Sequence, residues 1–296
     1  MAVIRSISAR FDQQIFRLYG IFCAVSLNYR ALLPGSGDPP PPKPPRGRHP
    51  GSAMTTAPAT TAPVARLHYL YDPLCGWCYA VAPLIATAAR LPGLAIELHA
   101  GGMMAGAQRR HVGRDWREYV LPHDRRIAQL SGQPFGEAYF DGLLLDEAAL
   151  LDSEPPIAAV LAAHTLGGRG LELLQRIQRA HYQHGRRIAE PATLRALALE
   201  LGLDGDAFDI AFAAQLGAPS QAHIEASRGL LRRLGGHGFP TVALEVGGST
   251  AASLDIGRYL GQPEAWRAHL LERLAGLRAA APAAFGCAAD GCALPA

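Results

Sequence analysis

The chain has 296 residues, of which 49% are hydrophobic and 18% are charged, and its net charge at neutral pH is +3. This composition provides enough apolar side chains for the core of an enzyme-sized domain. The small net charge gives no indication of binding to nucleic acid or to an anionic membrane surface. The basic cluster in residues 109–117 is interpreted as a solvated face, because no pattern of aromatic residues interleaves it. No run of about 18 uncharged apolar residues occurs, so the sequence predicts no membrane span.

Residues 1–63 differ in character from the rest of the chain. Ile15–Leu27 is moderately apolar but contains Arg17, and no small-residue cleavage site follows it, so it is a weak candidate for a signal peptide. The proline-rich stretch 39–48 has polyproline character and is not expected to pack. We interpret residues 1–53 as sequence upstream of a true start at Met54, or as a disordered extension. This interpretation predicts a cytoplasmic protein, whereas a genuine signal peptide would make it periplasmic.

The first regular elements form a strand–helix–strand unit. Arg66–Tyr71 and Leu94–Ala100 are rich in β-branched, leucine and aromatic residues, and they are predicted to be strands. Ala80–Arg90 between them is predicted to be a helix, because its apolar residues recur at positions i, i+3, i+4 and i+7. A unit of this length implies a right-handed crossover between parallel strands.

A Cys-Gly-Trp-Cys motif lies where the first strand gives way to the helix. This placement puts Cys75 at a helix N-terminus, where unpaired N–H groups and the helix dipole favour a thiolate over a thiol. A thiolate is the attacking species in thiol–disulfide exchange. The two intervening residues allow Cys78 to reach Cys75 and resolve a mixed disulfide. We therefore predict a redox site, with an exposed Trp77 shaping what docks there.

Two other interpretations of the cysteine pair remain open. A Cys-x-x-Cys motif can be half of a zinc site, and Cys287 and Cys292 near the C-terminus are the only candidates for a second half. A structural disulfide is the other interpretation, but so short a loop removes little entropy from the unfolded chain. His181 and His184 have the i, i+3 spacing of metal ligands, but no carboxylate completes them. We predict no metal site.

The segment 112–234 is predicted to be helical throughout, because leucine and alanine recur on one face of each segment and glycine or proline separates the segments. The expected helices are Asp115–Leu130, Pro156–Gly167, Gly170–Gly185, Ala192–Leu201, Asp204–Gln215 and Ser220–Leu234. Asp204 is expected to cap the helix that it begins.

A Gly-Phe-Pro-Thr sequence then leads into a predicted strand, Thr241–Val246. A proline at the start of a strand lacks the ladder N–H, so Pro240 is expected at an edge, a bulge or a cis turn. An ordinary trans proline in a loop is the alternative. A strand at about 249–252 and helices at 254–261 and 263–277 are expected to complete the fold.

Taken together, these motifs resemble the thioredoxin superfamily. The cysteine pair, Pro83 five residues after it, and Pro240 at the start of a later strand carry this resemblance. The long helical stretch between the halves resembles the DsbA family. Asp72 and the Gly-Gly-Met-Met-Ala-Gly sequence at 101–106 resemble its FrnE-like branch of predicted protein disulfide isomerases.

The resemblance implies an α/β fold, in which a thioredoxin-like sheet carries a large all-helical insertion between its β-α-β and β-β-α halves. Residues 64–110 and 235–278 would form the thioredoxin-like domain, and residues 111–234 the insertion. Residues 279–296 would be a flexible tail, and residues 1–63 the N-terminal extension described above.

The resemblance also implies roles for individual residues. Cys75 would attack, Cys78 would resolve, and Pro240 would keep a backbone edge open for an extended peptide. Further candidates are Trp77, Phe239 and Thr241 for substrate binding, and Asp72 and His237 for tuning the pKa of the cysteines. Periplasmic DsbA proteins bury an acidic residue in the first strand, where this chain has Tyr69. Asp72 is the nearest acid and is expected closer to the surface.

We therefore predict a thiol–disulfide oxidoreductase or isomerase that acts on protein or peptide thiols and disulfides, with glutathione as a further partner and without a cofactor. In a reducing cytoplasm such a site is expected to act as a reductase or isomerase. One alternative is a kappa-type glutathione-dependent transferase or isomerase, although such proteins typically have a serine in place of Cys75. The other is a chaperone-like binding module that grips unfolded chains.

Overall fold

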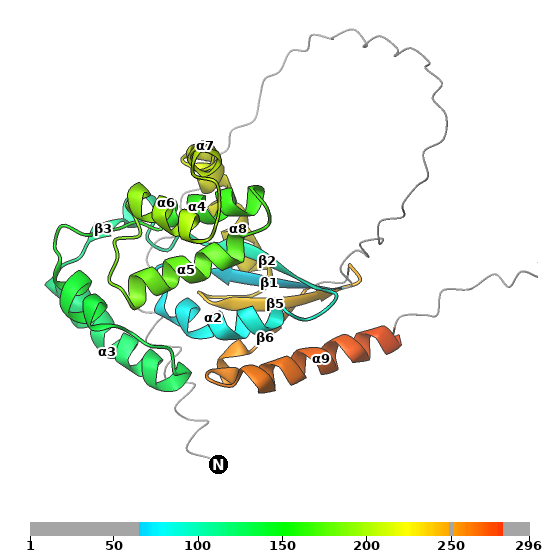
Figure 1. Cartoon of the computed structure of the whole chain (residues 1–296). Helices are drawn as coiled ribbons and strands as arrows, with labels where there is room; N and C mark the ends of the chain where they lie inside the picture. Colours follow the sequence, from blue (N-terminus) through cyan, green and yellow to red (C-terminus); the bar gives the residue numbers. More distant parts are fainter. Residues whose placement is uncertain (1–64, 249–250, 281–296) are drawn as a thin grey trace, which may run out of the picture. The chain divides into compact units, whose positions relative to one another are not determined.

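A mixed β-sheet lies at the centre of the computed structural model, which describes residues 65–248 and 251–280 (Figure 1). In the described residues the sheet has four strands in the order β2-β1-β5-β6. Strands β1 and β2 are parallel, whereas β5 is antiparallel to both β1 and β6. The strands are β1 (Ala65–Tyr71), β2 (Leu94–Ala100), β5 (Thr241–Val246) and β6 (Ala252–Leu254). The predicted thioredoxin-like sheet is confirmed.

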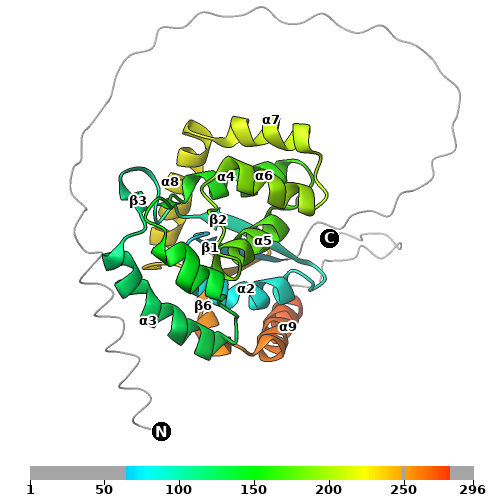
Figure 2. The same ribbon diagram turned by 60° about the vertical axis from the view of Figure 1, so that its left-hand side comes forward.

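Helix α2 (Gly76–Ala88) connects β1 to β2 and begins four residues before the predicted start at Ala80. Its buried residues form one face that packs against the sheet, and Tyr69 of β1 lies on the same side. Helix α9 (Pro263–Ala280) lies beside α2 in both views, and its Trp266 is fully buried (Figures 1 and 2). These two helices cover the face of the sheet on which the cysteine motif lies.

The predicted helical insertion separates β2 from β5. Its helices are α3 (Arg114–Ser131), α4 (Glu154–Thr165), α5 (Gly170–Tyr182), α6 (Pro191–Glu200), α7 (Gly205–Gln215) and α8 (Ala218–Arg233). Asp204 caps α7 as predicted, because its carboxylate accepts a hydrogen bond from the Ala207 N–H at 2.9 Å.

The prediction of helix throughout 112–234 is wrong in one region. Between α3 and α4 the chain forms a π-helical turn (Ala138–Gly142), a 3-10 turn (Leu143–Leu145) and the short strand β4 (Leu150–Leu151). Strand β4 pairs antiparallel with β3 (Arg110–His111), which precedes α3. This pairing joins residues about 40 positions apart and therefore leaves no local periodic signal.

The core runs without interruption from the sheet into the insertion. Most of helix α4 is buried between α5, α7 and α8, and its apolar residues join the same cluster as those of β1 and α2. Helix α8 returns to the sheet, where the ring of His223 accepts a hydrogen bond from the Ala100 N–H at 3.0 Å. The insertion is therefore anchored at the end of β2, close to the cysteine motif. The N-terminal extension, Cys287 and Cys292 lie outside the described residues.

Candidate active site

Cys75 is the residue that caps the start of α2, as the sequence predicted. Its carbonyl oxygen accepts hydrogen bonds from the Cys78 and Tyr79 N–H groups at 3.0 and 3.1 Å. The first N–H groups of a helix have no acceptor within the helix, so they create a local preference for negative charge. The side chain of Cys75 is 7% exposed. Its sulfur therefore lies at the positive end of the helix, and the residue keeps a small exposed surface that a disulfide can approach.

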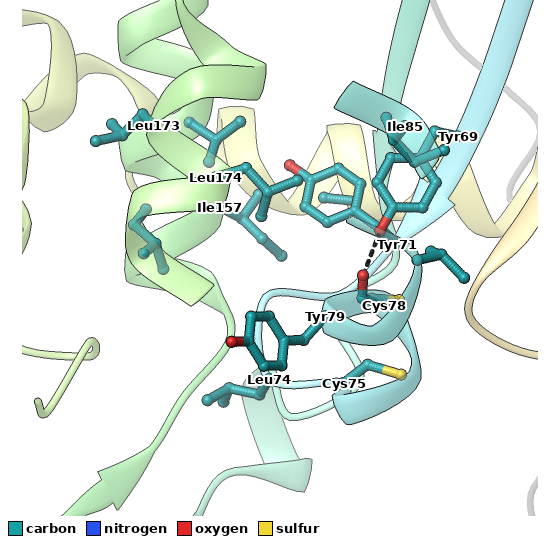
Figure 3. Packing of buried hydrophobic residues seen from close by; sticks show 14 of the residues in the cluster. Tyr69, Tyr71, Leu74, Cys75, Cys78, Tyr79, Ile85, Ile157, Leu173 and Leu174 are labelled. Carbon is teal, nitrogen blue, oxygen red and sulfur yellow. Dashed lines mark hydrogen bonds between the residues drawn. The ribbon is translucent and has the colours of Figure 1, made fainter. Parts of the chain in front are cut away.

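Cys78 has a different environment, although its sulfur lies on the same side of α2 (Figure 3). It is fully buried, and both cysteines are free thiols. Burial raises the pKa of the Cys78 thiol well above its usual range, and a hydrogen bond with the Cys75 side chain raises it further. At neutral pH Cys78 is therefore a protonated partner to Cys75. Beneath it, the Tyr69 hydroxyl donates to the Cys78 carbonyl oxygen at 3.1 Å.

Pro240 follows a cis peptide bond, which is one of the arrangements that the sequence left open. The Cys75 thiol donates to the Phe239 carbonyl oxygen at 3.4 Å, so this loop lies directly against the sulfur. The Phe239 ring packs on Gly101, where an added Cβ would overlap it. Thr241 begins β5, and its hydroxyl donates to the Gly238 carbonyl oxygen at 2.7 Å. His237 is an exposed residue of the same loop.

The expectation that Asp72 lies near the surface is wrong, because this residue is fully buried. Its carboxylate accepts hydrogen bonds from the Leu74 N–H at 2.9 Å and the Met103 N–H at 2.5 Å. The Ser153 hydroxyl donates a third, at 2.9 Å. Burial raises the pKa of Asp72 to about 6, although these hydrogen bonds oppose the shift. The ionised carboxylate in turn raises the pKa of Cys78, so Asp72 is electrostatically coupled to the cysteine pair.

Two residues of the insertion support this buried carboxylate, Ser153 directly and Arg228 through the neighbouring loop, and no sequence motif predicted either role. Ser153 precedes α4 in a sequence that is typical of a helix start, but its hydroxyl bonds to Asp72 rather than to the helix. The guanidinium group of Arg228 on α8 donates to the carbonyl oxygens of Gly101 and Gly102, both at 2.7 Å. Arg228 thereby fixes the loop that presents the Met103 N–H, and its charge lowers the pKa of Asp72.

A groove of about 290 Å³ lies beside the cysteine motif. It is lined by Trp77, Val81, Pro240, Leu254, Asp255, Ile256, Gly257 and Leu260. Trp77 is half-buried rather than exposed as predicted, because its ring packs against the core. The groove is therefore largely apolar and adjoins the proline loop.

The described part of the chain holds no group of three or more histidine, cysteine or acidic side chains that could bind a metal ion. His181 is buried, and burial lowers its pKa to about 4. Among the described residues, no helix has the length and apolar character needed to cross a membrane.

Several solved structures resemble this chain. The cytosolic disulfide reductase DsbM from Pseudomonas aeruginosa is 58% identical, and the match covers 71% of this chain and 98% of that one, with a TM-score of 0.67. A structure of DsbM with GSH gives 56% identity, 71% and 99% coverage and a TM-score of 0.66. A candidate protein disulfide isomerase from Nitrosomonas europaea, 24% identical, shares the fold with 72% and 98% coverage and a TM-score of 0.59. No family model and no curated protein matches the chain.

The thioredoxin-like fold and the cysteine pair at the start of α2 define an enzyme of thiol–disulfide exchange. The chain belongs to the DsbA family of thiol–disulfide oxidoreductases. The predicted family, fold class and general activity are thereby confirmed. The assignment to the FrnE-like branch stays a prediction.

Proposed function

We propose that the protein is a cytoplasmic reductase of protein or peptide disulfides that draws its electrons from glutathione. The observation that carries this proposal is the asymmetry of the cysteine pair: Cys75 caps a helix and is 7% exposed, whereas Cys78 is fully buried with a raised pKa. The likeness to a cytosolic disulfide reductase, and to the same protein with GSH, supports the direction and the compartment. Isomerase activity would use the same first step.

In the forward reaction the Cys75 thiolate attacks one sulfur of the substrate disulfide. A mixed disulfide forms between Cys75 and that sulfur, and the other substrate sulfur leaves as a thiolate. Cys78 then loses its proton and attacks Cys75, which releases the second substrate thiolate and leaves a Cys75–Cys78 disulfide. Two electrons have passed to the substrate. Two glutathione thiolates restore the dithiol in two further exchanges and become glutathione disulfide.

We assign to Asp72 the uptake of the Cys78 proton during the second step. Asp72 is buried, its charge acts on Cys78, and its pKa of about 6 leaves it ionised at pH 7. A buried carboxylate with this pKa can take up and return a proton near neutral pH. The buried position of Asp72 thus suits it to accept this proton, although the first strand itself has Tyr69 in place of an acid.

We assign substrate binding to the groove and the proline loop. The half-buried Trp77 and the apolar groove beside it suit a hydrophobic side chain of the substrate. The backbone around Pro240 and Thr241 suits an extended peptide segment. Phe239 contributes through its carbonyl oxygen at Cys75, while its ring supports the loop from Gly101. His237, exposed in the same loop, is assigned a lesser role in tuning the pKa of the cysteines.

The test uses the full chain and two matched cysteine variants. Cys75→Ser should abolish glutathione-driven reduction of insulin, whereas Cys78→Ser should accumulate mixed disulfides at Cys75 that mass spectrometry detects. Full activity of Cys75→Ser would overturn the mechanism. A reduction potential of the pair well above the cytosolic glutathione range, roughly −220 to −320 mV, would contradict the assignment as a cytoplasmic reductase.

Two further cysteine variants separate the alternative functions. Turnover of glutathione with an organic acceptor that is unchanged by Cys78→Ala would favour a kappa-type transferase. Suppression of aggregation that survives loss of both Cys75 and Cys78 would favour a chaperone-like binding module. Either result, in the absence of disulfide reduction, would replace the reductase assignment.

A further inference from the structure

A second buried carboxylate, Asp124 of α3, lies against the backbone between the two cysteines. Its side chain is 5% exposed, and its Oδ2 accepts a hydrogen bond from the Tyr139 hydroxyl at 2.7 Å. A Cβ placed on Gly76 would come within 2.7 Å of the Asp124 Oδ1 and 3.0 Å of the Ile127 Cδ1. The carboxylate therefore occupies the space that any larger residue 76 would need, at the first turn of α2.

The position of the Asp124 side chain is fixed by its hydrogen bond from Tyr139, which belongs to a cluster of aromatic rings. Tyr139 packs against His181 and Tyr182, with ring centroids 5.3 Å away in both cases. Tyr182 in turn stacks on Tyr79, which follows Cys78 in α2, with a centroid distance of 4.9 Å. The aromatic cluster therefore links the insertion to the first turn of α2 and fixes where the carboxylate lies.

The groups that face Asp124 come from α2, the π-helical turn and α5. From α2 the backbone at Gly76 faces it, from the π-helical turn Tyr139 does so, and the aromatic cluster adds His181 and Tyr182 of α5. His181 is neutral at pH 7, because burial lowers its pKa to about 4. Burial raises the pKa of the Tyr182 hydroxyl, and the charges of Tyr139, Asp124 and the two cysteines raise it further. On α3 itself, the neighbouring Arg125 and Arg126 are exposed.

We infer that Asp124 is a positioning residue for the reaction of Cys75, and that its carboxyl group competes with the Cys75 thiolate for the positive end of α2. Asp124 touches Gly76 rather than the reacting sulfur, so it acts on Cys75 through charge. When the carboxyl group is neutral, the helix N-terminus is free to stabilise the thiolate. When it is ionised, two like charges share the same low-dielectric region and oppose each other.

This competition links proton binding to the redox state. When the Cys75–Cys78 disulfide gains two electrons, Cys78 takes up one proton, and the new Cys75 thiolate favours uptake of a second proton by the Asp124 carboxylate. Oxidation of the pair reverses both steps and releases the second proton from Asp124. The inference uses the roles proposed above for Cys75 and Cys78, but it concerns a residue and a coupling beyond them.

The test compares Asp124→Asn with Glu118→Gln, an equal change of charge at an exposed position of the same helix. Iodoacetamide alkylation of the Cys75 peptide is followed by mass spectrometry from pH 5 to 9. In Asp124→Asn the midpoint of the Cys75 profile should fall by about one pH unit, because removal of a nearby like charge favours the thiolate. Glu118→Gln should match the wild type. Tyr139→Phe, which removes the hydrogen bond from the Tyr139 hydroxyl to Asp124 and so favours the neutral carboxyl group, should shift the midpoint in the same direction by less.

The redox equilibrium with glutathione provides a second measurement. The stabilised thiolate in Asp124→Asn should shift the equilibrium constant about tenfold toward the reduced protein, which corresponds to about 30 mV for a two-electron couple. An unchanged midpoint and an unchanged equilibrium in Asp124→Asn would overturn the inference, as would an equal shift in Glu118→Gln. Alkylation needs no disulfide substrate, so it tests the role of Asp124 independently of the proposed reductase activity. The insulin assay tests the reductase activity.

Discussion

Asp124→Asn is expected to stabilise the fold above neutral pH, and the size of the effect follows from the burial of the carboxyl group. Burial raises the pKa of Asp124 from 3.8 to about 7, with the Tyr139 hydroxyl acting in the opposite direction. The folded protein then binds this proton more tightly than the unfolded chain. The stability that this tighter proton binding contributes is fully present below about pH 4. It is lost as the pH rises through the folded-state pKa of about 7.

At 1.36 kcal/mol for each pKa unit, this shift corresponds to an upper limit of about 4 kcal/mol. Asparagine has nearly the same shape, and its carbonyl oxygen can still accept from Tyr139, but it carries no charge to desolvate. The gain in the free energy of unfolding should therefore be at most about 1 kcal/mol at pH 4.5 and rise to about 1–4 kcal/mol at pH 8. His181 also titrates at low pH, but it does so in both proteins and cancels in the comparison.

Urea unfolding of the reduced proteins at pH 4.5, 6 and 8 measures this difference, with excess reductant to exclude disulfide formation. Glu118→Gln serves as the control, because its side chain is exposed and its difference from the wild type should stay small at every pH. A difference between Asp124→Asn and the wild type that does not grow with pH would refute the reasoning. So would a variant less stable than the wild type at pH 8.

Three further predictions concern the support of the site. Gly76→Ala should lower the free energy of unfolding by about 1–3 kcal/mol in chemical denaturation, because its Cβ would press on a buried carboxylate held by another hydrogen bond. Gly101→Ala should displace the Phe239 ring and reduce insulin-reduction activity more than tenfold, while the rate of Cys75 alkylation changes less. Arg228→Met should move the acidic limb of the pH–rate profile upward from about 6, because the lost positive charge no longer favours ionised Asp72; an unmoved limb would contradict that role.

The sequence by itself determined the parts of this protein that depend on neighbours in the chain. The redox pair was predicted from two cysteines at the junction of a strand and a helix, and α2 begins directly after Cys75. The strands β2 and β5 have the bounds that the pattern of apolar and β-branched residues predicted. The cap at Asp204 was also predicted, because capping is decided by residues within three positions of each other.

Only the tertiary structure showed which buried carboxylates lie beside the cysteine motif. Asp72 was expected near the surface, but its partner Ser153 lies 81 positions away and buries it. Asp124 reaches Gly76 because α3 packs against α2. Its neighbours in the sequence are exposed, so the local pattern did not indicate that Asp124 is buried. Burial and hydrogen bonding set the pKa values of both groups, and contacts between distant segments create both effects. Local sequence patterns do not indicate contacts between distant segments. The redox motif was therefore predictable from the sequence, whereas the burial and pKa values of the nearby carboxylates were not.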